Sequence, residues 1–222
     1  MFKPLPLESF KQKTGIDFFN FVGGWEGVEK VVSLRGMKKV FAIQAMPHPY
    51  LRRLLDNVTL KGDSEVFPYK SCEFDSVKVD PNSVRVGQTF VQRSKYQGFI
   101  EDFPDLLDGF CANSGIANRN ASILLGENES GTLVVAHYLP PIIEKHNGWH
   151  CLLDGIHRNF LSKNIGMTIE SIVIKGVDTP FPCDLGEWSE VEVVEDKPSK
   201  PDRFFNLKKN LFRDLKKIGI DG

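Results

Sequence analysis

Cysteine is scarce in this sequence: Cys72, Cys111, Cys151 and Cys183 are its only four. They include no close pair of the kind that a zinc site or a redox motif requires, so we expect reduced thiols. A run of 18 apolar residues, which a membrane span needs, is also missing. The first residues contain no apolar stretch of signal-peptide length. We therefore expect a cytoplasmic protein without a membrane partner.

An excess of charge of either sign is absent as well. The 28 basic and 29 acidic residues leave a formal net charge of -1. Such a chain has no overall field that would collect nucleic acid, so any nucleic-acid partner must be bound by a local patch. The 41% hydrophobic and 26% charged residues are typical of a globular protein and exclude a disordered or fibrous chain.

Changes in periodicity and the placing of proline and glycine divide the chain into three predicted regions: 1–72, 73–176 and 177–222. In the first region, Trp25, Val28, Val32 and Arg35 recur at helical spacing, and Gly36 would end that helix. We expect residues 1–72 to form a mainly helical extension.

Residues 73–176 show an α/β (α+β) pattern. A strand at 74–79 is followed by a helix that would align Phe99, Phe103, Leu106, Leu107 and Phe110 on one face. Asn147-Gly148 stands between the apolar runs 141–144 and 149–153, which is the strongest short-range signal for a β-hairpin. A helix at 157–164 and a buried strand at 169–174 complete the region. These elements predict a small mixed sheet.

The last region, 177–222, combines an acidic strand at 184–196 with a basic helix at 206–218. Leu207, Leu211, Leu215 and Ile218 would form the apolar stripe of this helix, packed on the core. Its lysines and arginines favour either pairing with the acidic strand and solvent or contact with DNA, and both interpretations remain open.

The most informative segment is the turn Asp154-Gly155-Ile156-His157-Arg158, which joins a strand to a helix. Gly155 and the N–H groups that follow it, from Ile156 on, can cradle a phosphate at the positive end of the helix dipole. Arg158 can grip phosphate oxygens in two places. His157 can orient or protonate a phosphoryl group, and Asp154 can bind Mg²⁺ or act as a base. The alternative is that Asp154 caps the helix and Arg158 pairs with a carboxylate.

Histidines gather between residues 137 and 157, but the strand geometry argues against a shared metal centre, because neighbouring residues of a strand point to opposite faces. His137 precedes the strand that begins at Pro140-Pro141 and is predicted to face the same phosphate pocket. The alternative is a surface or hydrogen-bonded structural histidine.

Residues 76–176 resemble the ParB/sulfiredoxin superfamily. Sulfiredoxins have a Pro-Pro-Ile strand and a Gly-Cys-His-Arg turn that holds ATP phosphates, and here Pro140-Pro141-Ile142 and Gly155-Ile156-His157-Arg158 match except at the cysteine. Ile156 offers no nucleophile, so sulfinic acid reduction is not expected. The turn is also similar to that of the DGQHR proteins linked to DNA phosphorothioation, at four of five positions. A free-serine kinase of the superfamily carries a related turn.

The resemblance implies a fold of ParB/sulfiredoxin type and a bound nucleoside triphosphate, ATP or CTP with Mg²⁺. It implies that Lys95 contacts the nucleotide and that Gln88 and Arg93 lie near its base or phosphates. The expected activity is hydrolysis of the triphosphate or phosphoryl transfer. The alternatives are a DNA-associated binding module or nuclease that uses the same turn, and a scaffold with an inactive site. The base, the acceptor and the oligomeric state remain open.

Overall fold

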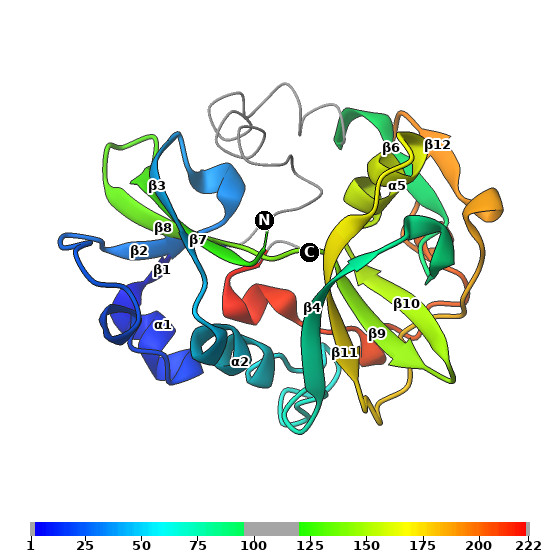
Figure 1. Cartoon of the computed structure of the whole chain (residues 1–222), viewed down its shortest axis with the longest axis horizontal. Helices are drawn as coiled ribbons and strands as arrows, with labels where there is room; N and C mark the ends of the chain where they lie inside the picture. Colours follow the sequence, from blue (N-terminus) through cyan, green and yellow to red (C-terminus); the bar gives the residue numbers. More distant parts are fainter. Residues whose placement is uncertain (1–2, 96–119, 221–222) are drawn as a thin grey trace. The chain divides into compact units, whose positions relative to one another are not determined.

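The computed structural model describes residues 3–95 and 120–220, and the chain forms two compact units (Figure 1). Unit 1 takes its described residues from Met1–Ser71, Asn120–Leu139 and Arg213–Gly222. Unit 2 takes them from Cys72–Arg119 and Pro140–Phe212. Both units contain helices and mixed sheets, which confirms the predicted α+β class.

Unit 1 is built on a five-stranded sheet in the order β1-β2-β8-β7-β3. Its strands are β1 Leu5–Pro6, β2 Lys30–Val32, β3 Lys39–Ala45, β7 Ser122–Glu127 and β8 Leu133–Tyr138, with helices α1 Leu7–Thr14 and α2 His48–Asp56. The β7–β8 hairpin turns at Asn128, whose side-chain oxygen accepts the N–H groups of Ser130 and Thr132. Apolar residues of β7 and β8, Ile123 and Val135 among them, are buried.

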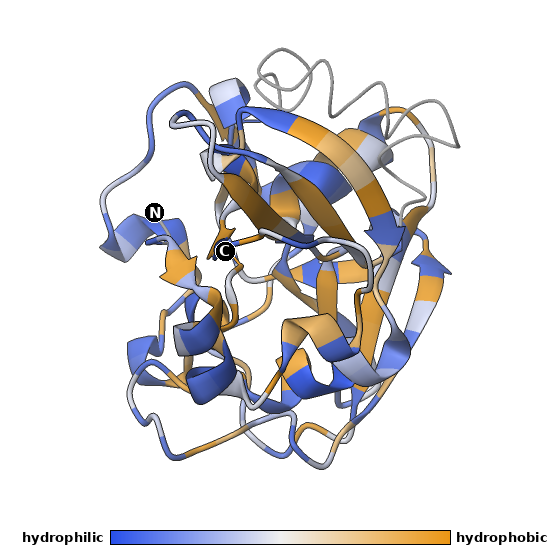
Figure 2. Ribbon diagram, turned by 90° about the vertical axis from the view of Figure 1, so that its left-hand side faces the viewer, coloured by the Kyte–Doolittle hydropathy of each residue, from blue (hydrophilic) through white to orange (hydrophobic). Residues whose placement is uncertain are grey.

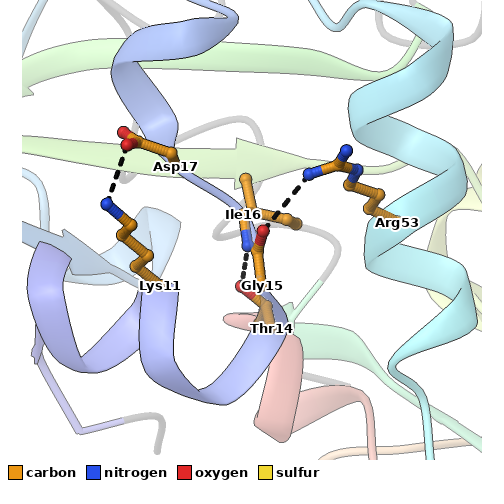
Figure 3. A network of polar contacts seen from close by, with 6 residues as sticks. All are labelled: Lys11, Thr14, Gly15, Ile16, Asp17 and Arg53. Atoms are coloured by element: carbon orange, nitrogen blue, oxygen red, sulfur yellow. Dashed lines mark hydrogen bonds and ion pairs between the residues drawn. The ribbon is translucent and has the colours of Figure 1, made fainter.

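The end of α1 shows how local chemistry fixes a chain direction in unit 1 (Figure 3). Gly15 adopts a left-handed conformation with φ of 67°, which ends the helix. The Thr14 hydroxyl accepts the Ile16 N–H at 3.2 Å, and Arg53 of α2 donates to the Gly15 carbonyl at 3.2 Å. These contacts join the end of α1 to α2.

Unit 2 contains a second five-stranded sheet in the order β4-β11-β9-β10-β5 and a two-stranded sheet of β6 and β12. The elements are β4 Glu73–Val79, β5 Val84–Val86, β6 Phe90–Gln92, β9 Ile142–His146, β10 Trp149–Asp154, α5 Ile156–Asn164, β11 Ile169–Lys175 and β12 Glu192–Val194. The predicted hairpin is confirmed: Trp149 pairs with His146 across a two-residue turn in which Asn147 and Gly148 have φ of 50° and 85°.

The two faces of the five-stranded sheet of unit 2 are covered by different parts of that unit. On one face, Ile156 of α5 packs with Val86, Ile143, Leu152 and other buried aliphatic residues. On the other face, Cys151 packs with buried residues of the segment after β11, Phe181 and Cys183. Hydrophobic and hydrophilic residues alternate along strands and helices (Figure 2), as elements with one buried face require.

Short 3₁₀ turns complete the described structure. They are η1 Phe18–Asn20, η2 Leu34–Gly36, η3 Pro81–Ser83, η5 Trp188–Glu190, η6 Pro201–Arg203, η7 Lys209–Leu211 and η8 Leu215–Ile218. Within residues 3–95 and 120–220, no helix has the length and apolar character that crossing a bilayer requires. The helix predicted around Phe99 to Phe110 lies outside the described residues.

Residues 1–72 hold helices α1 and α2, but three strands of unit 1, β1, β2 and β3, lie there as well. The helix expected around Trp25–Arg35 is instead β2 followed by η2. Val31 and Val32 are buried and pair in parallel with β8. Branched residues fit a pleated sheet well, and this pairing outweighs the helical spacing.

The basic helix predicted at 206–218 was also wrong. The segment contains η7 and η8, and Asn206 has a positive φ of 46°. Arg213 is buried and forms an isolated bridge with Leu60, and the Asp214 N–H donates to the Thr59 carbonyl at 2.7 Å. These contacts with a distant segment use backbone groups that a helix would have kept for itself.

The units also interleave along the chain, whereas the sequence suggested three consecutive regions at 1–72, 73–176 and 177–222. Strands β7 and β8 lie within the predicted region 73–176, yet they belong to the sheet of unit 1. The segment from Arg213 onwards returns to unit 1 as well. The other described strands of that region belong to the two sheets of unit 2.

Candidate functional site

The site begins where β10 passes into α5. The register of β10 against β9 shifts between Leu152 and Asp154, so a bulge lies immediately before the turn. Gly155 then adopts φ of 91°. A Cβ atom there would lie 2.9 Å from Pro141 Cβ and Cγ, so the position needs glycine both for its backbone conformation and for space. The Pro-Pro strand and the Asp-Gly turn therefore pack directly on each other.

The first turn of α5 is held firmly in place. Ile156 is buried among the aliphatic residues of the sheet. Asn159 is fully buried, and both its backbone N–H and its side-chain amide donate to the Gly155 carbonyl, at 3.0 and 3.2 Å. No described side chain caps the helix. The N-terminal end of α5, where a helix presents N–H groups and partial positive charge, is thus built on a rigid base.

Asp154 and Arg158 form an ion pair across this turn. Arg158 Nη2 lies 3.3 Å from Asp154 Oδ2, and the two side chains are 11% and 20% exposed. Burial raises the pKa of the Asp154 carboxyl above its ordinary value. The Arg158 charge, the Gly155 N–H and the Lys95 charge oppose this rise. The carboxylate is therefore surrounded by positive groups in a place where water is restricted.

Lys95 follows β6, and the described residues 93–95 are helical. Its charge acts on the Asp154 carboxyl, so Lys95 lies near the turn although the two positions are 59 apart in the sequence. The structure thus brings Lys95, Asp154 and Arg158 into one neighbourhood of unit 2.

His157 is fixed by the strand that leads to Lys95. The backbone N–H of Gln92, the last residue of β6, donates to His157 Nε2 at 3.1 Å. Because Nε2 accepts this bond, the proton of the neutral ring lies on Nδ1. This bond ties β6 to the start of α5.

The structure does not bring every predicted site residue to the turn. The Gln88 side chain donates to the Phe90 carbonyl at 2.7 Å, and Gln88 bridges to Phe204. Arg93 Nε lies 2.7 Å from a carboxylate oxygen of Glu195, beyond the end of β12. In these described contacts, both residues engage the β6–β12 side of unit 2 rather than Asp154 or Arg158.

His137 lies in β8 of unit 1 and is 3% exposed. Its Nε2 is 2.7 Å from the Tyr50 hydroxyl, and burial lowers the pKa of the imidazole from 6.5 to about 4. These surroundings match the alternative of a hydrogen-bonded structural histidine, and unit 2 holds the turn without it.

The sequence also allowed Asp154 to cap the helix and Arg158 to pair with a carboxylate. The second half of that alternative is observed, because Arg158 pairs with the carboxylate of Asp154. Gln92 and Asn159 also position the site but were not identified from the sequence, and Pro141 was named there only as part of the Pro-Pro-Ile match. Asn159 carries the only local signal among them, since it follows Gly155 by four residues and can reach its carbonyl in a helix.

Magnesium can be matched to this site by its chemistry. Within the described part of the chain, no group of three or more His, Cys, Asp or Glu side chains is arranged to hold a metal ion. Mg²⁺ nevertheless binds commonly through one or two carboxylates together with substrate phosphates and water. The partly exposed carboxylate of Asp154, beside a helix N-terminus, fits that mode.

Comparison of the chain with protein-family models, with curated proteins and with solved structures gives no match.

Proposed function

We propose that the turn of unit 2 binds a nucleoside triphosphate, ATP or CTP with Mg²⁺, in a cytoplasmic protein that hydrolyses it or transfers a phosphoryl group. One observation carries the proposal: Arg158 and the N-terminus of α5 flank one partly exposed carboxylate, on which the charge of Lys95 also acts. Two cations whose charge reaches the same helix N-terminus favour an anion with several charges there.

Each group has a distinct part in this proposal. The N–H groups of Gly155 and of the first helical turn donate to phosphate oxygens, and the planar guanidinium of Arg158 donates to two oxygens at once. Lys95 neutralises further charge. His157 directs its Nδ1–H at a phosphoryl oxygen, because Gln92 occupies Nε2. Asp154 accepts a proton from the attacking hydroxyl or holds Mg²⁺, which when bound supplies positive charge to the phosphates.

The DNA-associated alternative has lost one of its supports. It relied on the same turn together with a basic helix at 206–218, and that segment is not a helix in the described structure. The turn itself still offers phosphate contacts, so DNA binding is a defined outcome of the test. Retention on DNA resin that falls steeply with salt would favour it.

A thermal-shift panel tests the proposal. ATP, CTP, GTP, UTP and AMP are added with and without Mg²⁺, because a ligand at 100 times its Kd stabilises the folded chain by about 2.7 kcal/mol. We expect one triphosphate to raise the Tm of the wild-type chain and to raise that of Arg158→Ala clearly less. No shift with any nucleotide would contradict the proposal.

Unit 1 provides the matched control. Arg52 and Asp56 form a pair of the same spacing along a helix, with 3.4 Å between Nη1 and Oδ1. Arg52→Ala removes an arginine from an equivalent pair and should keep the full nucleotide response. Release of inorganic phosphate, or transfer of labelled γ-phosphate to a hydroxyl acceptor, then separates an active enzyme from a scaffold that binds without turnover.

A further inference from the structure

The partners of Asp154 are the same groups that the proposed function assigns to phosphate. Arg158 Nη2 lies 3.3 Å from its carboxylate, and the Gly155 N–H and the Lys95 charge also stabilise the charged form of Asp154. A carboxylate and a phosphate oxygen bind to such groups in the same way, since both are anionic hydrogen-bond acceptors. The side chain thus takes the position that an anionic ligand would take.

Phosphate and Asp154 cannot both use Arg158 fully. A phosphate that entered with Asp154 in place would bring two like charges into contact in a half-buried setting, where such repulsion is strong. The side chains of Arg158 and Asp154 are 11% and 20% exposed, so part of the pair is accessible to solvent. The turn is braced through Gly155 and Asn159, which leaves side-chain rotation of Asp154 and Arg158 as the motion available.

We infer that Asp154 is an internal competitor of the phosphate ligand: its carboxylate occupies the anion-binding groups until a triphosphate takes Arg158 and displaces it. Displacement then frees the carboxylate of Asp154 from Arg158, so that it can act as the base or the magnesium ligand of the proposed function. Binding of the triphosphate is therefore what makes the carboxylate available as a base or a magnesium ligand. This inference rests on the proposed function.

The experiment measures binding of inorganic triphosphate by calorimetry in the presence of EDTA. Inorganic triphosphate has no base or ribose, and EDTA removes any role of Asp154 as a metal ligand. Asp154→Asn keeps the shape of the side chain and removes the competing charge. We expect the variant to bind about 5-fold more tightly than the wild-type chain, as the loss of one competing ion pair allows.

Asp75→Asn is the matched control. Asp75 pairs with Lys175 at 2.6 Å between β4 and β11 of the same unit, and its loss changes the net charge of the protein by the same amount. Its affinity for triphosphate should equal that of the wild-type chain. An equal gain in Asp75→Asn would show a general charge effect and overturn the inference.

A wild-type readout covers the case in which Asp154→Asn does not fold. The carboxyl ¹³C signal of Asp154 should move when the wild-type chain is saturated with triphosphate, because its guanidinium partner leaves. An unmoved signal, or equal or weaker binding by the variant, would overturn the inference while leaving nucleotide binding intact. If neither protein binds triphosphate or any nucleotide, the proposed function itself fails.

Discussion

Acid should destabilise unit 1 through a single buried imidazole, that of His137. The side chain is 3% exposed, its Nε2 contacts the Tyr50 hydroxyl at 2.7 Å, and the ring of Phe10 lies 5.5 Å away. Burial lowers the pKa of His137 from 6.5 to about 4, because a charged imidazolium would lose its hydration there.

The direction in which pH changes the free energy of unfolding follows from which state, folded or unfolded, binds the proton. Between pH 6.5 and about pH 4, the unfolded chain protonates His137 and the folded chain does not, so the free energy of unfolding falls as the pH falls. One pKa unit corresponds to about 1.4 kcal/mol, so His137 alone removes about 3 kcal/mol of stability over this range. Its contribution is complete above pH 6.5 and is lost at about pH 4.

Urea unfolding at pH 7 and pH 4 measures this loss in the wild-type chain and in His137→Gln. The variant lacks the titrating group, so its loss between the two pH values should be smaller by about 3 kcal/mol. His48→Gln, which removes an exposed histidine of the same unit, should behave like the wild-type chain. Equal pH dependence of wild type and His137→Gln, or an imidazole signal of His137 that titrates near pH 6.5, would refute the reasoning.

Two further predictions concern the turn of unit 2. Gly155→Ala should lower the free energy of unfolding by about 2 kcal/mol or more, because the backbone there is left-handed and the new Cβ meets Pro141 at 2.9 Å. Gly166→Ala, where φ is 70° and the space is open, should lower it by about 1 kcal/mol. Equal losses in urea unfolding would contradict the packing argument. Burial raises the folded-state pKa of Asp154, although Arg158 and Lys95 oppose the rise. The contribution of Asp154 to stability is therefore present at low pH and falls as the pH rises through that pKa. Between pH 4 and pH 7, Asp154→Asn should gain stability relative to the wild-type chain, and a relative loss in urea unfolding would contradict this prediction.

The elements predicted correctly from the sequence are those whose determinants are local. Asn147 and Gly148 supply the two left-handed residues of a tight hairpin turn, and no distant contact is needed to specify it. In the same way, Gly155 before α5 and Gly166 after it mark the ends of that helix. The neighbourhood of Asp154 and Arg158 could be predicted because the two residues are only four positions apart in the sequence.

Elements fixed by distant partners could not be predicted. The apolar and basic spacing around Leu211 and Leu215 fits a helix, yet buried Arg213 bridges to Leu60, which lies far away in the chain. Strand β2 depends on pairing with β8, about 100 residues further on. The bond from the Gln92 N–H to His157 likewise joins segments that no spacing rule connects.

The central claim is that Arg158 and the first turn of α5 hold nucleotide phosphates. Calorimetric titration of the wild-type chain and Arg158→Ala with ATP and CTP in the presence of Mg²⁺ tests it most directly. The account predicts binding of one triphosphate by the wild-type chain and an affinity at least about tenfold lower in the variant, the loss expected for a charged hydrogen bond. Equal affinity in the two proteins, or no binding by either, would contradict it.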